Sequence, residues 1–319
     1  MVVILWNVYS VWENETINKQ NIIDASKKTG MRPDIIERVI ALYDTIYQVM
    51  NADIKQTFIG GSMINQVYID PDEARLSIDV DTVVRESIER KSELIDIFVD
   101  LREKMLKNQC IYQINIGNSV VYIGEISSDT KRQDLYPKVL FLKRSIPSFF
   151  VGTPLSNYLN KLGLTSKNKN VNKFLMNLKK ELGYLPKIYD VRIEISFDKE
   201  GINYPFKKSK VHPYFKNTLT PYKIFSCEIE EASSVAEGKI EFLNIIDEIQ
   251  TINIINTICD LRIIYLYDLD IKIPEKTILK VEKIMDKCQT DFEKYWFYKL
   301  ISSKYTFYEI FKKIIGSKS

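Results

Sequence analysis

Hydrophobic positions recur at helical spacing in several parts of the chain. From Ile22 to Met50 they predict two consecutive helices, and Pro33 lies where the first turn of the second helix accepts a proline. The same spacing predicts helices over Ile88 to Lys107 and over Asn170 to Leu182. From about Ser233 to the end the pattern is helical, which predicts a helical C-terminal region.

Short segments of alternating hydrophobic and polar residues lie between these helices and predict strands. They are 56–59, 76–84, 112–116, 119–126, 135–142 and 188–197, with Gly117-Asn118 as the turn of an antiparallel pair. In the last segment the hydrophobic residues fall on one face, and Arg192, Glu194 and Ser196 fall on the other. The mixture predicts an α+β protein, with a strand-containing core over 1–230 and a helical domain over 231–319.

The composition is that of a globular protein with a sizeable core, since 45% of the residues are hydrophobic, 12% aromatic and 27% charged. No apolar run approaches the roughly 20 residues that span a bilayer. The chain also begins without the basic segment of a secretory signal. We therefore expect a cytoplasmic protein that does not bind to a membrane.

The cysteine spacing does not match a zinc site or a disulfide framework. None of the cysteines lies in a CxxC pair, and the single histidine, His212, is distant from them in sequence. The cysteines are Cys110, Cys227, Cys259 and Cys288. They are expected to be reduced and mostly buried thiols.

The first candidate for chemistry directly follows the strand predicted over 56–59. It is the turn Gly60-Gly61-Ser62, which leads into a short helix predicted over 62–69. Glycines let a backbone approach a phosphate closely, and the free N–H groups at the start of a helix attract anions. Gly60, Gly61 and Ser62 are therefore candidate phosphate-binding residues.

Two aspartates lie one residue apart on the next predicted strand, within the segment Arg75-Leu76-Ser77-Ile78-Asp79-Val80-Asp81. The two-residue period of a strand places Asp79 and Asp81 on one face together with Ser77, with the aspartates roughly 7 Å apart. Both carboxylates can then reach a pair of divalent ions, the arrangement used for in-line phosphoryl displacement. Asp79 and Asp81 are candidate metal ligands.

Glu194 is a candidate third metal ligand because it lies on the polar face of a later strand. A half-exposed strand explains Glu194 nearly as well. Taken separately, an aspartate pair or a glycine turn is also common without function. Their strand–turn–helix–strand order makes a phosphate and metal site the better interpretation.

Three charged side chains occupy positions where the helical pattern favours apolar residues. Lys239 falls on the apolar stripe of segment 235–249, and Asp260 and Arg262 are the only charges in 249–267, which is apolar nearly all round. Burying an unpaired charge costs several kcal/mol, so these charges should be paired or should line a cleft. A structural Asp260–Lys239 or Asp260–Arg262 ion pair would also satisfy the pattern.

These motifs resemble those of the AbiEii-type nucleotidyltransferases, toxins of toxin–antitoxin and phage-abortive systems that are related to the MenT toxins. The first family motif is similar to Gly60-Gly61-Ser62, and the second, R-x-S-x-D-x-D, matches Arg75, Ser77, Asp79 and Asp81. A later lysine and aspartate of the family are similar to Lys239 and Asp260. The resemblance extends from about residue 20 to 270.

The resemblance implies a polymerase-β-like nucleotidyltransferase fold, with a mixed sheet, flanking helices and a C-terminal helical region that contributes to the active site. The two aspartates would bind Mg²⁺ or Mn²⁺, and Gly61 and Ser62 would hold the triphosphate of an NTP. Lys239 would neutralise phosphate charge, as lysines do at many phosphoryl-transfer sites. Asp260 would position that lysine or the attacking hydroxyl.

Family members are linked to transfer of NMP onto RNA, notably the 3′ end of tRNA, and a cognate antitoxin protein would be a further partner. The segment 161–187 contains seven lysines and one acid, Glu181, which suits an RNA backbone and equally a solvated surface helix. Two other functions fit the same residues. One is a catalytically silent fold that binds nucleotide or RNA, and the other is transfer of NMP to a protein hydroxyl.

Overall fold

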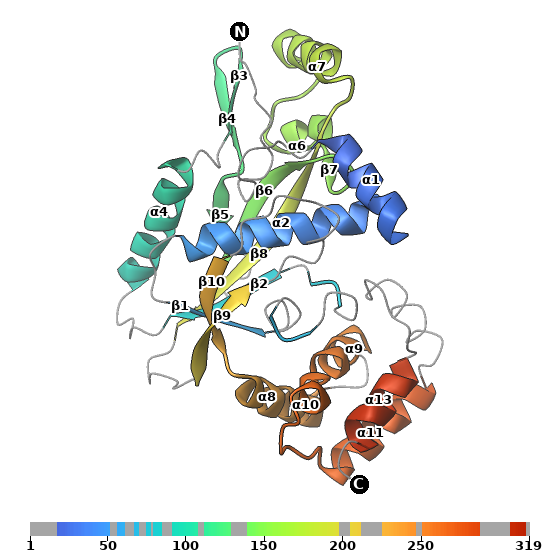
Figure 1. Cartoon of the computed structure of the whole chain (residues 1–319). Coiled ribbons are helices and arrows are strands. Elements are labelled where there is room, and N and C mark those ends of the chain that lie inside the picture. The colour runs from blue at the N-terminus through green and yellow to red at the C-terminus, as the bar shows by residue number, and fades with distance from the viewer. Residues whose placement is uncertain are drawn as a thin grey trace.

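A mixed β-sheet lies at the centre of the molecule (Figure 1). The computed structural model describes residues 18–51, 56–60, 67–69, 75–77, 79–84, 91–107, 112–128, 139–197, 205–211, 225–246, 251–287 and 307–316. Across the sheet the strands are β5 (Ile126–Ser128), β6 (Val139–Ser148), β8 (Lys187–Phe197), β2 (Asp79–Val84), β1 (Gln56–Ile59), β10 (Phe225–Glu230) and β9 (Phe206–Val211), and β7 (Thr153–Pro154) pairs with β8. The β2–β8 and β1–β10 pairs are parallel and the others are antiparallel. The predicted α+β class is confirmed.

One face of the sheet is covered by the second of the two N-terminal helices. The predicted pair is present as α1 (Lys19–Thr29) and α2 (Pro33–Met50), and Pro33 begins α2 as expected. In Figure 1 α2 crosses in front of the sheet, and it contacts β2, β6 and β8. Along this layer Arg144 Nη1 of β6 lies 2.6 Å from Asp44 Oδ2 of α2, and both side chains are buried. Side chains on this face of β2, β6 and β8 therefore pack against α2.

The peripheral elements follow the predictions closely. The amphipathic helix is α4 (Lys91–Lys107), the antiparallel pair is β3 (Tyr112–Ile116) and β4 (Ser119–Ile123), and the lysine-rich helix is α7 (Lys169–Leu182). The second strand of the pair ends at Ile123 rather than at residue 126, because Gly124 turns the chain with a φ of 90°. The chain then enters the main sheet as β5.

The region after the sheet is helical, as predicted. The last described strand ends at Glu230, and the following helices are α8 (Ala232–Ile245), α9 (Thr251–Asp260), α10 (Ile263–Leu266), α11 (Glu275–Lys287) and α13 (Phe307–Gly316). Within the described residues, no helix is both long and apolar enough to cross a membrane. Cys227 and Cys259 are buried, reduced thiols, as expected, whereas Cys110 and Cys288 lie outside the described residues.

Several predicted boundaries were wrong. The second strand begins at Asp79 rather than at residue 76, and the strand expected over 135–142 is the longer and later β6. The single helix expected over 249–267 is broken after Asp260, where Arg262 N–H bonds to the Cys259 carbonyl three residues back. This break ends α9 at Asp260, and α10 begins at Ile263.

Four elements were not predicted, namely α6 (Leu155–Lys161), β7, β9 and β10. The edge strand β9 carries three lysines and little apolar alternation, so its sequence gives a weak strand signal. In β10 the signal was present, because Phe225, Cys227 and Ile229 alternate and are all buried.

Candidate active site

The two aspartates of β2 face away from α2. Val80, between them, is fully buried in the core, and Ser77 Oγ donates a hydrogen bond to Asp79 Oδ1 at 3.2 Å. Asp81 is in register with Glu194 of the parallel strand β8, so both side chains lie on the same face of the sheet. The structure therefore brings together Ser77, Asp79, Asp81 and Glu194 as the sequence predicted.

The glycine turn meets these carboxylates directly. Strand β1 ends at Ile59, which is paired with Asp81, and Gly60 follows with a φ of +77°. A Cβ atom at Gly60 would lie 2.8 Å from Asp81 Oδ2, so this position has neither the backbone conformation nor the room for a side chain. Gly61, Ser62 and most of the short helix predicted over 62–69 lie outside the described residues.

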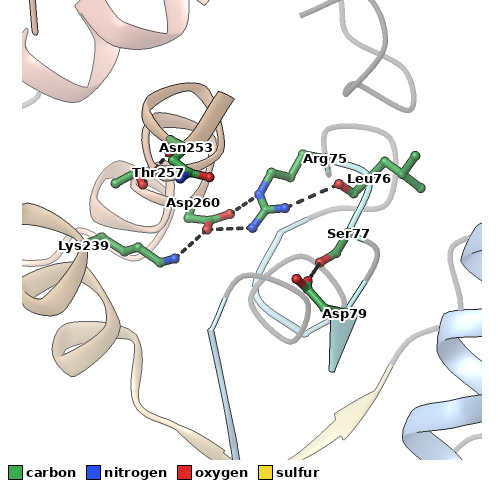
Figure 2. Close-up of polar contacts among 8 residues, drawn as sticks. All are labelled: Arg75, Leu76, Ser77, Asp79, Lys239, Asn253, Thr257 and Asp260. Atoms are coloured by element: carbon green, nitrogen blue, oxygen red, sulfur yellow. Dashed lines mark hydrogen bonds and ion pairs between the residues drawn. The ribbon is translucent and has the colours of Figure 1, made fainter. Parts of the chain in front are cut away.

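The charges of the helical region converge on the segment that carries the aspartates. Figure 2 shows Asp260, at the end of α9, between Arg75 and Lys239. Its Oδ1 atom accepts from Arg75 Nε at 2.7 Å, and its Oδ2 atom accepts from Arg75 Nη2 at 3.0 Å and lies 3.2 Å from Lys239 Nζ. Of the two ion pairs that the sequence left open for Asp260, the one with Lys239 is present.

Arg75 is a partner that sequence reasoning missed. It was matched to a family motif but given no role, and its distance of 185 positions from Asp260 leaves no local signal. Burial alone would lower the pKa of Arg75, but the charge of Asp260 and the hydrogen bonds to it overcome this effect and raise that pKa. The bidentate pair holds the carboxylate in one orientation, which fixes where Lys239 can be held.

Asp81 lies close to two other carboxylates, those of Asp79 and Glu194. Burial, followed by the charges of Asp79 and Glu194, raises the pKa of Asp81 to about 8, although Lys239 and Arg75 act in the opposite direction. A group of carboxylates that cannot all ionise readily is stabilised by a bound cation, and oxygen ligands are those that Mg²⁺ prefers. The residues therefore fit a divalent cation held by Asp79 and Asp81.

Glu194, the candidate third ligand, lies beside Asp81 on the neighbouring strand. Among the residues that the structure describes, no group of three or more His, Cys, Asp or Glu side chains has the arrangement of a metal-binding cluster. Mg²⁺ is commonly held by one or two carboxylates, with water and substrate phosphates supplying the other ligands. An open site of two aspartates is compatible with that chemistry, and Glu194 adds charge beside it.

The raised pKa of Asp81 makes metal binding depend on pH. Below about pH 8 a proton competes with the metal for this carboxylate, so the apparent affinity for Mg²⁺ is expected to fall about tenfold per pH unit. Above pH 8 the affinity should level off. Calorimetric titration of the protein with MgCl₂ at pH 6.5, 7.5 and 8.5 measures this. An affinity that is the same at all three values would contradict a site that includes Asp81.

Comparison with solved structures finds MenT4, a nucleotidyltransferase toxin from Mycobacterium tuberculosis H37Rv. The two chains are 12% identical with a TM-score of 0.39, and the match covers 86% of this chain and 73% of MenT4. No protein-family model matches the chain, and no curated protein matches it by sequence. What the protein does must therefore be inferred from its own side chains.

Proposed function

We propose that the protein is a metal-dependent nucleotidyltransferase that moves NMP from an NTP to an acceptor. One observation carries the proposal: Asp260 binds Arg75, which begins the aspartate segment, and also Lys239 of α8. This double pairing holds the ammonium group of Lys239 within electrostatic reach of Asp81, and Asp81 in turn lies beside Gly60. Opposite charges held close together for anion and metal binding are typical of phosphoryl-transfer sites.

Each residue has a distinct role in the proposed reaction. Asp79 and Asp81 would hold Mg²⁺ or Mn²⁺, which would neutralise charge on the phosphates. The turn that begins at Gly60 would bind the triphosphate through backbone N–H groups, and Lys239 would offset its negative charge. The acceptor hydroxyl would form a bond to the α-phosphorus as the bond to the β-phosphate oxygen breaks, releasing pyrophosphate and a proton.

Asp260 acts on Lys239 rather than on the acceptor in this scheme. Its side chain is fully buried, and Arg75 engages both of its oxygens. Lys239, by contrast, is 24% exposed and can contact a ligand. Asp260 is therefore proposed as a positioning residue for the lysine. The attacking hydroxyl would approach from the open side of the site.

RNA, with the 3′ end of tRNA as the model acceptor, is proposed as the substrate that receives the nucleotide. On α7 the lysines at 169, 173, 179 and 180 are exposed, and such lysines bind phosphate backbones without sequence specificity. In Figure 1 α7 lies at the opposite end of the molecule from α8 and α10. An acceptor that touches both α7 and the region of α8 and α10 must be extended, which favours a polynucleotide. In a toxin–antitoxin system the protein would be the toxin, with a cognate antitoxin protein as its partner.

The test is transfer of label. The protein is incubated with MgCl₂ and each α-labelled NTP in turn, together with total tRNA or with cell extract. Label on RNA is expected, and label on protein would instead establish protein NMPylation. If no nucleotide gives label on any acceptor, the transferase proposal is refuted, and binding of nucleotide without transfer would identify a catalytically silent fold.

A further inference from the structure

Glu230 is a buried carboxylate for which the sequence assigned no role. It ends β10 and is 9% exposed. Phe58 of β1 is in register with Ile229, and Ile59 is in register with Asp81. Because neighbouring strand residues point to opposite faces, Glu230 lies on the same face of the sheet as Asp81, with β1 between them.

The contacts of Glu230 join three parts of the proposed site. Its carboxylate accepts the backbone N–H of Gly60 and, at 2.7 Å, the hydroxyl of Ser234 in α8. Its backbone carbonyl accepts the hydroxyl of Tyr68 at 2.7 Å, so the segment after the glycine turn is also attached. Lys239 is close enough to stabilise its charge. No other described carboxylate is shown to contact both the turn and α8.

These contacts are hard to explain by charge alone. A carboxylate beside a triphosphate repels it, so a purely electrostatic site would place a neutral or cationic residue here. A buried acid that costs desolvation is retained most simply where its hydrogen bonds fix a conformation. The conformation in this case is the backbone of Gly60, which has a φ of +77° and no space for a side chain beside Asp81.

We propose that Glu230 is a positioning residue that holds Gly60, at the end of β1, and the Lys239 helix in one arrangement for the triphosphate. The inference deepens the proposed function and rests on it for the identity of the ligand. Glu230 binds the N–H of Gly60 and so holds the backbone at the end of β1 in place beside Asp81. Ser234 directs the carboxylate toward the turn.

The test uses binding of inorganic triphosphate with MgCl₂ to the full chain, measured by calorimetry. Glu230→Ala removes the acceptor, and we expect affinity to fall about tenfold even though a negative charge is lost. Glu230→Gln keeps an acceptor oxygen without the charge, and affinity should return to within about twofold of wild type or become tighter. Ser234→Ala should weaken binding about threefold. Glu228→Ala, which removes the acid two residues earlier on the same face, is the matched control and should bind as wild type does.

The outcomes separate positioning from electrostatics and from folding. If Glu230→Ala binds triphosphate as tightly as wild type, or more tightly, positioning is refuted. Equal losses in Glu230→Ala and Glu230→Gln would also refute it, because the acceptor oxygen would then not matter. If Glu230→Ala unfolds, as shown by its melting curve, Ser234→Ala decides, and unchanged binding in that variant overturns the proposal. A wild-type protein that binds triphosphate but transfers no label would refute the transferase and leave this result intact.

Discussion

Asp81→Asn is expected to abolish nucleotidyl transfer and, at the same time, to stabilise the metal-free protein above pH 8. Loss of a metal-binding carboxylate removes several kcal/mol of transition-state stabilisation, which corresponds to a rate loss of about 1,000-fold. In the folded protein Asp81 is half-buried, and burial together with the charges of Asp79 and Glu194 raises its pKa to about 8. Asparagine has a similar shape and no charge, so it relieves this repulsion.

The pH dependence gives the sign of the stability effect. Between about pH 4 and pH 8 the unfolded chain releases the Asp81 proton while the folded protein keeps it, so stability falls as the pH rises. Above pH 8 the loss is complete and constant. Melting temperatures at pH 5 and pH 9 should therefore differ more for wild type than for Asp81→Asn, and MgCl₂ should raise only that of wild type.

Asp190→Asn is the control for this comparison, since Asp190 is an exposed carboxylate on the same face of the sheet. Asp190 Oδ1 accepts a hydrogen bond from Ser145 Oγ at 2.7 Å. It should leave both transfer and the pH dependence of melting close to wild type. Substantial transfer by Asp81→Asn would contradict the proposed metal site. A melting temperature that is lower than that of wild type at pH 9 would show that Asp81 supports the fold instead.

Asp260→Asn is expected to damage both stability and activity. The change removes the counter-charge of Arg75, which is only 6% exposed, and breaking a buried ion pair in this way costs about 3–5 kcal/mol. Lys239 also loses the carboxylate that holds it, so transfer should fall about 100-fold in the protein that remains folded. Urea denaturation and the transfer assay at saturating MgCl₂ measure the two effects.

A double variant distinguishes a buried ion pair from ordinary packing. Arg75→Met combined with Asp260→Leu removes both charges, so it should be more stable than either single variant, although it should remain inactive. The pair of Arg102 and Glu125, which are 2.6 Å apart and 50% and 28% exposed, provides the control. Glu125→Gln should cost at most about 1 kcal/mol because water already solvates both charges. Additive effects of the two buried substitutions would contradict the pairing.

Much of the fold was predictable because local patterns decide it. The helical repeat that forms α2 and the alternation that forms β8 are written in neighbouring residues, and hydrophobic burial acts on both in the same way. Prediction failed where distant parts of the chain decide the outcome. Strand β9 has a solvated, lysine-rich sequence and exists because β10 lies beside it.

For the candidate site, the sequence by itself determined which groups share one local element. The two-residue period of β2 puts Asp79 and Asp81 on one face, and the apolar surroundings of Lys239 and Asp260 require those charges to be paired or to line a cleft. Only the tertiary structure decided the partners: Arg75 binds Asp260 across 185 positions, and Glu230 reaches Gly60 from another strand. The physical reason is that the cost of burying a charge is a local property, whereas tertiary packing decides which group lies close enough to offset that cost.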